Sequence, residues 1–178
     1  MNHRHEHGVT LVETAIVLPM LILLALGIAE IGFGLISQMT AAQAVREGAR
    51  TAANGSTAAS TELATIKAIE QAMCAIKTGE LISVEIFKSD DEGNPISPSL
   101  LNRYEVSGPL QCSNTPATAL VCVNGCPWPP SARSNHLGSL DKIGVRVYYT
   151  HKWLLDAVFT DNPTWSDVSV MQIEPEVQ

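Results

Sequence analysis

The feature that most constrains this chain is a stretch near its beginning, residues 14–36, that is almost entirely apolar. Its one charged residue is Glu30, near the end of the stretch. As a helix it would be about 34 Å long, enough to cross a hydrocarbon core of about 30 Å. A helix buried in a soluble domain is usually shorter and has a polar face. The segment from Thr14 to Ile36 is therefore predicted to be a transmembrane helix, in which Pro19 is tolerated at the cost of a kink.

Three fates of this segment are compatible with its sequence. It could be a secretory signal peptide cut after Gly27-Ile28-Ala29, a small-x-small site, although Arg4 is the only certain cation before it. It could be a plain uncleaved anchor, although Arg4 before the span and Arg46 and Arg50 after it specify the orientation poorly. The third fate is cleavage before the span, and it accounts for more of the residues. The evidence for it lies in the residues just before the span.

Those residues read Gly8-Val9-Thr10-Leu11-Val12-Glu13. Their order resembles the processing site of type IV prepilins, where a membrane-embedded prepilin peptidase removes a short polar leader ending in Gly and a Glu stands five residues after the cut. The resemblance implies a leader over residues 1–8 and a mature chain that begins at Val9. An unpaired carboxylate inside a bilayer costs about 3 kcal/mol, and the new α-amino group has a pKa near about 8. Glu13 is therefore predicted to pair with the mature amino terminus of its own or a neighbouring subunit.

The longer segment VETAIVLPMLILLALGIAEIGFGLISQMTAAQAVREGARTAA narrows the resemblance. It contains a Glu-x-Ala start, a Leu-Pro pair, an acid late in the span and an Ala-rich part with two arginines; these are Glu13, Ala15, Leu18, Pro19, Glu30, Arg46 and Arg50. In these features the chain is similar to the TadE-like family, pseudopilin-like proteins of the tight-adherence (Flp) pilus assembly system. The similarity covers residues 8–53.

The helix is predicted to continue beyond the membrane over residues 37–53 and to end at Asn54-Gly55. One side of this part carries apolar residues at helical spacing, namely Met39, Ala42, Val45, Ala49 and Ala52. Such a face could pack against the chain's own domain or against other pilin-like subunits, because both interfaces use the same residues. The sequence leaves both open.

Residues 61–178 are predicted to form a small extracytoplasmic α+β domain of pilin-like type. A second helix over 61–78 carries a stripe of large side chains and is stopped by Gly79; the stripe is Leu63, Ile66, Ile69, Met73 and Ile76. Strands are predicted at 82–87 and 142–150, with possible short strands at 119–123 and 169–173 in addition. In the strand at 142–150, Ile143, Val145, Val147 and Tyr149 are expected to point inward. Trp153, Leu154, Val158 and Phe159 are expected to form an apolar turn that caps the sheet.

The four cysteines, Cys74, Cys112, Cys122 and Cys126, are candidates for two disulfides. An even count suits an exported domain and allows three pairings, among which the sequence does not choose. Zinc binding is less favoured, because only Cys122 and Cys126 form a close pair.

Other chemistry has little support in the sequence. Lys and Arg number 11 against 18 Asp and Glu, and without a basic cluster nucleic acid is not an expected partner. No motif for nucleotide binding or for a catalytic nucleophile is present, so no enzymatic activity and no cofactor are predicted. The alternating His3, His5 and His7 fall in the predicted leader, and Asp90, Glu92 and Asn94 suit a solvated turn better than a calcium loop. No metal site is predicted.

Two functions remain. The first, implied by the resemblance, is a non-enzymatic minor pilin or pseudopilin-like subunit for assembly of Flp-type pili. Its partners would be the lipid membrane, prepilin peptidase, other pilin-like subunits and the pilus assembly machinery. It would span the bacterial inner membrane once, with a cytoplasmic amino terminus and a periplasmic domain, and could enter a surface pilus. The alternative is a membrane-anchored or secreted extracytoplasmic binding domain delivered by a signal sequence.

Overall fold

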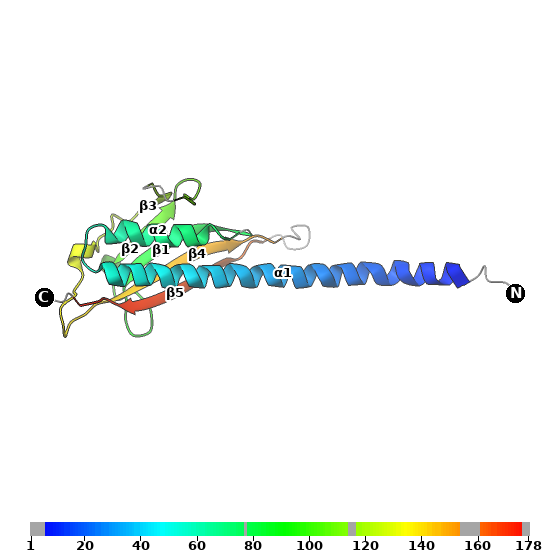
Figure 1. Cartoon of the computed structure of the whole chain (residues 1–178), viewed down its shortest axis with the longest axis horizontal. Coiled ribbons are helices and arrows are strands. Elements are labelled where there is room, and N and C mark those ends of the chain that lie inside the picture. Colours follow the sequence, from blue (N-terminus) through cyan, green and yellow to red (C-terminus); the bar gives the residue numbers. More distant parts are fainter. Residues whose placement is uncertain (1–5, 77, 114–116, 154–160, 176–178) are drawn as a thin grey trace.

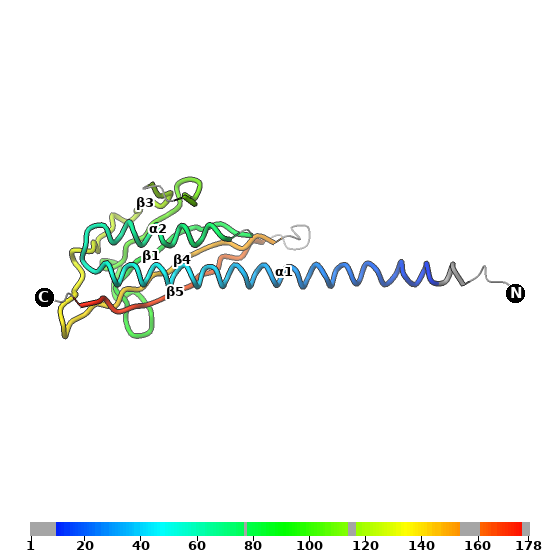
Figure 2. Tube along the Cα trace, viewed as in Figure 1, coloured from blue at the N-terminus to red at the C-terminus, as the bar shows by residue number. Residues whose placement is uncertain are grey.

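The computed structural model describes residues 6–76, 78–113, 117–153 and 161–175, with the backbone alone at residues 6–9. A single helix, α1 (Glu6–Gly55), leads into a compact domain and extends far beyond it at the amino-terminal end (Figures 1 and 2). The domain contains a second helix, α2 (Thr61–Met73), and one antiparallel sheet. The predicted α+β class with a long amino-terminal helix is therefore confirmed.

The sheet has five strands in the order β3-β2-β1-β4-β5. They are β1 (Gly79–Lys88), β2 (Leu101–Val106), β3 (Leu120–Cys122), β4 (Lys142–His151) and β5 (Thr164–Gln172). Two 3-10 turns, η1 (Pro98–Leu100) and η2 (Pro130–Ala132), lie in the connections. The central strand β1 pairs with β4 from Gly79↔His151 to Lys88↔Ile143, with a register shift between Leu81 and Ser83.

Both helices cover the same face of the sheet (Figure 1). The later part of α1 contacts α2, β4 and β5. The core between these elements consists of aliphatic and aromatic side chains from the strands and α2, with small residues from α1. Its main members are Ala41, Ala44, Val45, Ala49, Ala52, Ile66, Ile69, Met73, Val84, Ile86, Ile143, Val145, Val147 and Tyr149.

Several predicted elements agree with the structure. The first helix ends at Gly55, as its Asn-Gly signal indicates. The strands at 82–87 and 142–150 are present and longer than predicted, and the carboxyl-terminal strand pairs with β4. Ile143, Val145, Val147 and Tyr149 are all completely buried, so their inward direction is confirmed.

Two predictions about the domain are wrong in detail. The second helix ends at Met73 rather than at residue 78, because the chain turns at Cys74 and Gly79 begins β1 instead of capping a helix. Leu63 does not belong to the buried stripe, since it is 45% exposed. Strand β2 is present in addition, at residues that none of the predicted strands covers. Of the predicted apolar turn, only Trp153 lies within the described residues; Leu154, Val158 and Phe159 lie outside them.

Candidate functional site: the amino-terminal helix and its junction with the domain

The first described part of α1 has nothing packed on it. From Thr10 to Ala29 every side chain is exposed, apart from the half-exposed Gly27. These 20 or so residues, which we call the free part of α1, span about 30 Å at 1.5 Å per residue. That length matches the hydrocarbon core of a bilayer. By length and composition, α1 is the one helix among the described residues that could cross a membrane.

The residues predicted to act in processing and pairing lie at the start of this helix. Gly8 and Val9 are helical in backbone, and their side chains lie outside the description. Glu13 is exposed on the free part. The Thr14 hydroxyl donates to the Thr10 carbonyl oxygen at 2.8 Å, which gives that polar group a partner within the helix. Pro19 lies inside α1, and the helix continues through it. The roles of these residues stay predictions.

The free part ends at a buried contact between Glu30 and His151. Glu30 is 4% exposed, and its Oε1 lies 3.6 Å from Nε2 of His151 at the end of β4. The predicted span from Thr14 to Ile36 therefore overlaps a region that packs on the domain. Ser37, one residue beyond Ile36, contacts Thr78 through their hydroxyl oxygens at 3.1 Å. The sequence could not pair Glu30 with His151, because they are far apart along the chain.

Two tryptophans surround His151. The indole of Trp165 stacks on the imidazole with ring centroids 4.8 Å apart, and Trp153 meets it edge-on at 4.9 Å. Gly34 of α1 is buried against this cluster, and a Cβ at that position would be in ordinary van der Waals contact with the Trp165 ring, at 3.4 Å. These residues form the junction cluster: Glu30, Gly34, His151, Trp153 and Trp165.

Beyond the junction, α1 buries small residues against its own domain. Ala41, Ala44, Ala49 and Ala52 are buried, and a Cβ at Gly48 would lie 2.5 Å from Cγ1 of Ile69. We call residues 30–55 the packed part. Of the two uses that the sequence left open for this face, most of it serves packing on the chain's own domain. Met39 departs from that pattern, because it is 64% exposed.

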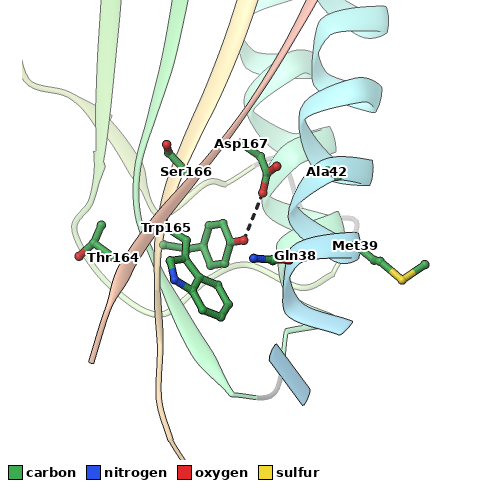
Figure 3. A pocket seen from close by; sticks show the side chains of 8 residues that line it. Gln38, Met39, Ala42, Thr164, Trp165, Ser166 and Asp167 are labelled. Carbon is green, nitrogen blue, oxygen red and sulfur yellow. Dashed lines mark hydrogen bonds between the residues drawn. The ribbon is translucent and has the colours of Figure 1, made fainter. Parts of the chain in front are cut away.

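A groove lies between the packed part and the edge strand β5 (Figure 3). It has a volume of about 560 Å³, and its lining comprises Gln38, Met39, Ala42, Tyr149, Thr164, Trp165, Ser166 and Asp167. The Tyr149 hydroxyl donates to the Asp167 carboxylate at 3.1 Å. Burial raises the pKa of Tyr149, and the Asp167 charge raises it further.

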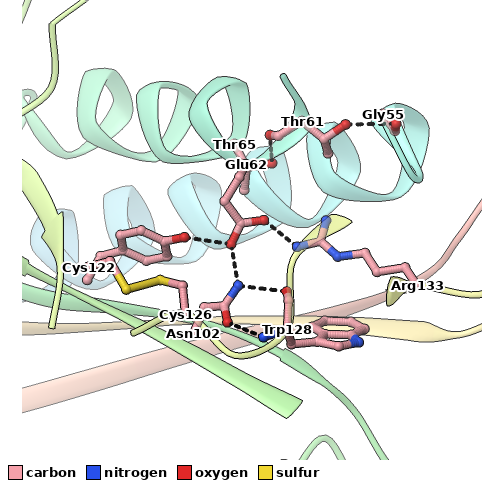
Figure 4. A network of polar contacts seen from close by, with 10 residues as sticks. Gly55, Thr61, Glu62, Thr65, Asn102, Cys122, Cys126, Trp128 and Arg133 are labelled. Atoms are coloured by element: carbon pink, nitrogen blue, oxygen red, sulfur yellow. Dashed lines mark hydrogen bonds and ion pairs between the residues drawn. A yellow bond between two sulfur atoms is a disulfide. The ribbon is translucent and has the colours of Figure 1, made fainter. Parts of the chain in front are cut away.

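The other end of the domain is closed by a polar network around Glu62 (Figure 4). Its Oε1 accepts hydrogen bonds from the Asn102 amide at 2.7 Å and the Tyr104 hydroxyl at 2.8 Å, and its Oε2 pairs with the buried Arg133 guanidinium. That guanidinium also lies 4.7 Å above the Trp128 ring. Burial is the main cause of a raised pKa at Tyr104. The network joins α2 to β2 and to the loop before β4.

The cysteines pair as Cys74–Cys112 and Cys122–Cys126, with Cα–Cα distances of 5.7 and 6.1 Å. The first disulfide joins the end of α2 to the loop before β3. Glu70 holds the same loop, because its Oε1 accepts hydrogen bonds from the backbone N–H groups of Gln111 and Ala119 at 2.7 and 3.0 Å. Two disulfides are thus present, and the structure selects one of the three pairings.

The inward direction of the Glu62 and Glu70 carboxylates was not predicted from the sequence. The two glutamates are eight residues apart, a spacing that places them on one side of α2. This spacing is the only signal in the sequence that could have indicated that both point the same way. Within the described ranges, no group of three or more metal-ligating side chains comes together. His3 and His5 lie outside the described residues, as does the side chain of His7.

These features define a class of protein: a small disulfide-containing α+β domain carried on a single long helix whose first part is apolar and uncovered. Residues 8–50 match the family model described as TadE-like protein, which confirms the resemblance seen in the sequence. The match covers the free part of α1 and most of the packed part, and it implies involvement in the Flp/Tad pilus system. No curated protein and no solved structure matches the chain.

Proposed function

We propose that the chain is a non-enzymatic minor pilin or pseudopilin-like subunit that helps to assemble Flp-type pili. The observation that carries the proposal is that the family match contains an uncovered apolar helix long enough to cross a bilayer. The family match covers residues 8–50, and within it the uncovered apolar part of α1 has the length of a bilayer. The free part would cross the inner membrane, with the domain on the periplasmic side.

The division of α1 supports lateral assembly through its amino-terminal part. The packed part already uses its small-residue face on its own domain. The free part keeps all its faces uncovered, and Ala25 and Ala29 form a small-xxx-small pair on it that would allow close approach of another helix. Neighbouring pilin-like subunits are thus proposed to pack there, within the membrane.

Glu13 is proposed to pair with the mature amino terminus after prepilin peptidase has cut between Gly8 and Val9. Glu13→Gln keeps the shape of the side chain and removes its charge. We expect this variant to be processed normally and to assemble pili poorly. Glu47→Gln is the matched control, because Glu47 is an exposed carboxylate on the packed part of the same helix. Normal piliation with Gln at position 13 would contradict the pairing role.

One observation favours the alternative of a secreted binding domain. A signal-peptidase cut after Ala29 would release a chain that begins at Glu30, the first residue buried against the domain, and would leave the core intact. The mature amino terminus separates the two functions. Intact mass and amino-terminal sequencing of protein from native membranes should give Val9 for the pilin-like subunit. A start at Glu30 would contradict it, and an intact Met1 would indicate a plain anchor.

A further inference from the structure

We propose that the junction end of the domain rests in the headgroup region of the bilayer through Trp153 and Trp165, so that the domain has a fixed depth on the membrane. The inference rests on the proposed membrane anchoring of α1. The partner is the lipid interface itself, at the border between acyl chains and headgroups.

The free part of α1 leaves no spacer between membrane and domain. Its uncovered residues span about 30 Å, the thickness of the hydrocarbon core. The next residue, Glu30, is buried against His151. Once the free part fills the hydrocarbon core, the junction cluster must therefore lie at the membrane surface. A domain held away from the membrane would need additional exposed helix before its first contact.

The junction cluster has the chemistry that favours this depth. Trp153 and Trp165 are both partly exposed, and they lie at the end of β4 and the start of β5, which face the free part of α1 (Figure 1). The Trp153 indole N–H donates to the Asp161 carbonyl oxygen at 2.9 Å. Tryptophan is enriched where apolar and polar surroundings meet, because its ring is apolar and its N–H is polar. The third tryptophan, Trp128, is 1% exposed and belongs to the core.

Charge contributes little to this surface. Lys152 lies between His151 and Trp153 in the sequence. It pairs with Glu80 on β1, and both side chains are exposed. Glu30 and His151 are buried together beneath the tryptophans. The exposed cation is thus balanced by an acid. The rings, rather than attraction to anionic lipid, are what would hold the domain at the interface.

The three tryptophans allow a direct test in the full chain. Variants that keep one tryptophan and replace the other two by Phe are reconstituted in phosphatidylcholine nanodiscs. The lipids carry bromine either near the headgroup end or near the methyl end of the acyl chain, and fluorescence quenching is measured. We expect bromine near the headgroup to quench Trp153 and Trp165 about twofold, and bromine near the methyl end to quench them less. Trp128, the internal control, should not respond to either lipid.

A reporter within the span separates failure of this inference from failure of the proposed function. Ile22→Trp in a chain whose native tryptophans are all Phe places the reporter near the middle of the free part. It should be quenched most by bromine near the methyl end. If it is not, the anchoring itself is wrong. If it is, and aqueous iodide rather than bromolipid quenches Trp153 and Trp165, the anchor stands and the interfacial seating is overturned.

Two further measurements sharpen the assignment. Lys152→Gln should leave the quenching of both tryptophans unchanged, and so should added anionic lipid. A loss of quenching in either case would overturn the conclusion that the rings alone set the depth. Protection of Trp165 from both bromolipid and iodide, increasing with the protein-to-lipid ratio, would assign this surface to a second copy of the chain and overturn the proposal. Far-UV circular dichroism of each single-tryptophan variant verifies that its fold is retained.

Discussion

The free and packed parts of α1 form one uninterrupted helix and are built from different residues. The free part is rich in leucine and isoleucine, with all of them exposed, whereas the packed part buries alanine and glycine. Large side chains suit a helix surrounded by lipid, because they cover the backbone with apolar area. Small ones suit a helix that lies against a sheet already filled by Val145, Val147 and Tyr149. The packed part also has large apolar side chains, among them Ile31, Leu35 and Ile36, but these are exposed. The two parts of the helix therefore differ in the size of the side chains that α1 buries against the domain.

The largest contrast is expected when the same charge is placed in each part. Ala49→Asp would bury a carboxylate in the core without a partner, and should reduce the free energy of unfolding by about 4 kcal/mol or more. Ala25→Asp should leave the domain's stability unchanged and weaken membrane insertion by about 3 kcal/mol. Denaturant unfolding in detergent micelles, followed by tryptophan fluorescence, measures the first effect. Membrane fractionation measures the second. Equal losses of domain stability would contradict the division of α1.

A residue outside α1 should affect the stability of the domain in the same way as one in the packed part. The polar network around Glu62, at the far end of the domain, allows this test. Glu62→Ala leaves the buried Arg133 guanidinium without its carboxylate, and should cost about 3–5 kcal/mol of unfolding free energy. Asp91→Asn is the control, because Asp91 forms an exposed pair with Lys142; its unfolding midpoint should stay unchanged. If Glu62→Ala behaves like the control, the network is not needed to hold α2 and the loop before β4 against the sheet.

A change of size should have a smaller effect than a change of charge. Gly48→Leu inserts a side chain where even a Cβ would lie 2.5 Å from Ile69, and should cost about 1–3 kcal/mol. Gly27→Leu is the matched variant in the free part, where no atom lies within 4 Å of a Cβ, and it should leave domain unfolding unchanged. The same denaturant series measures both. Tolerance of leucine at position 48 would mean that α1 can move away from the sheet.

How far the sequence predicts this molecule depends on whether a signal is local. The apolar run of the free part, the Asn-Gly end of α1 and the alternation in β4 each lie within one segment, and each agrees with the structure. The glycine signal at residue 79 is less reliable: it predicts a helix stop, whereas Gly79 begins β1. Strand β2 alternates polar and apolar residues, but its proline-rich surroundings concealed that pattern.

The polar contacts were the least predictable part. Glu30 reaches His151, Glu62 reaches Arg133, and Glu70 reaches the backbone of Gln111. In each case the partner is distant in sequence and lies on another element. Periodicity marks a face of a helix as apolar or polar, but it does not say which acids on the polar face find a buried partner. The pairing of the four cysteines was open for the same reason.

The smallest predicted effect concerns Tyr149, where the packed part of α1 meets β4 and β5. Its pKa is raised in the folded state, mainly by burial and then by Asp167. The unfolded phenol ionises near about pH 10, so the unfolded state releases a proton that the folded state retains. The contribution of the raised Tyr149 pKa to the free energy of unfolding is therefore fully present below about pH 10. It is lost as the pH rises beyond that, by at most about 1.4 kcal/mol per pH unit for one group.

Tyr149→Phe should lower the free energy of unfolding at pH 8, through loss of the hydrogen bond to Asp167, and should flatten the fall of stability at alkaline pH. Urea unfolding of both chains between pH 8 and 11 measures the two slopes. Parallel slopes would mean that water reaches Tyr149 through the groove beside Gln38 and Met39, and that this section of α1 is less closely packed than Ala44 and Ala49 farther along the helix.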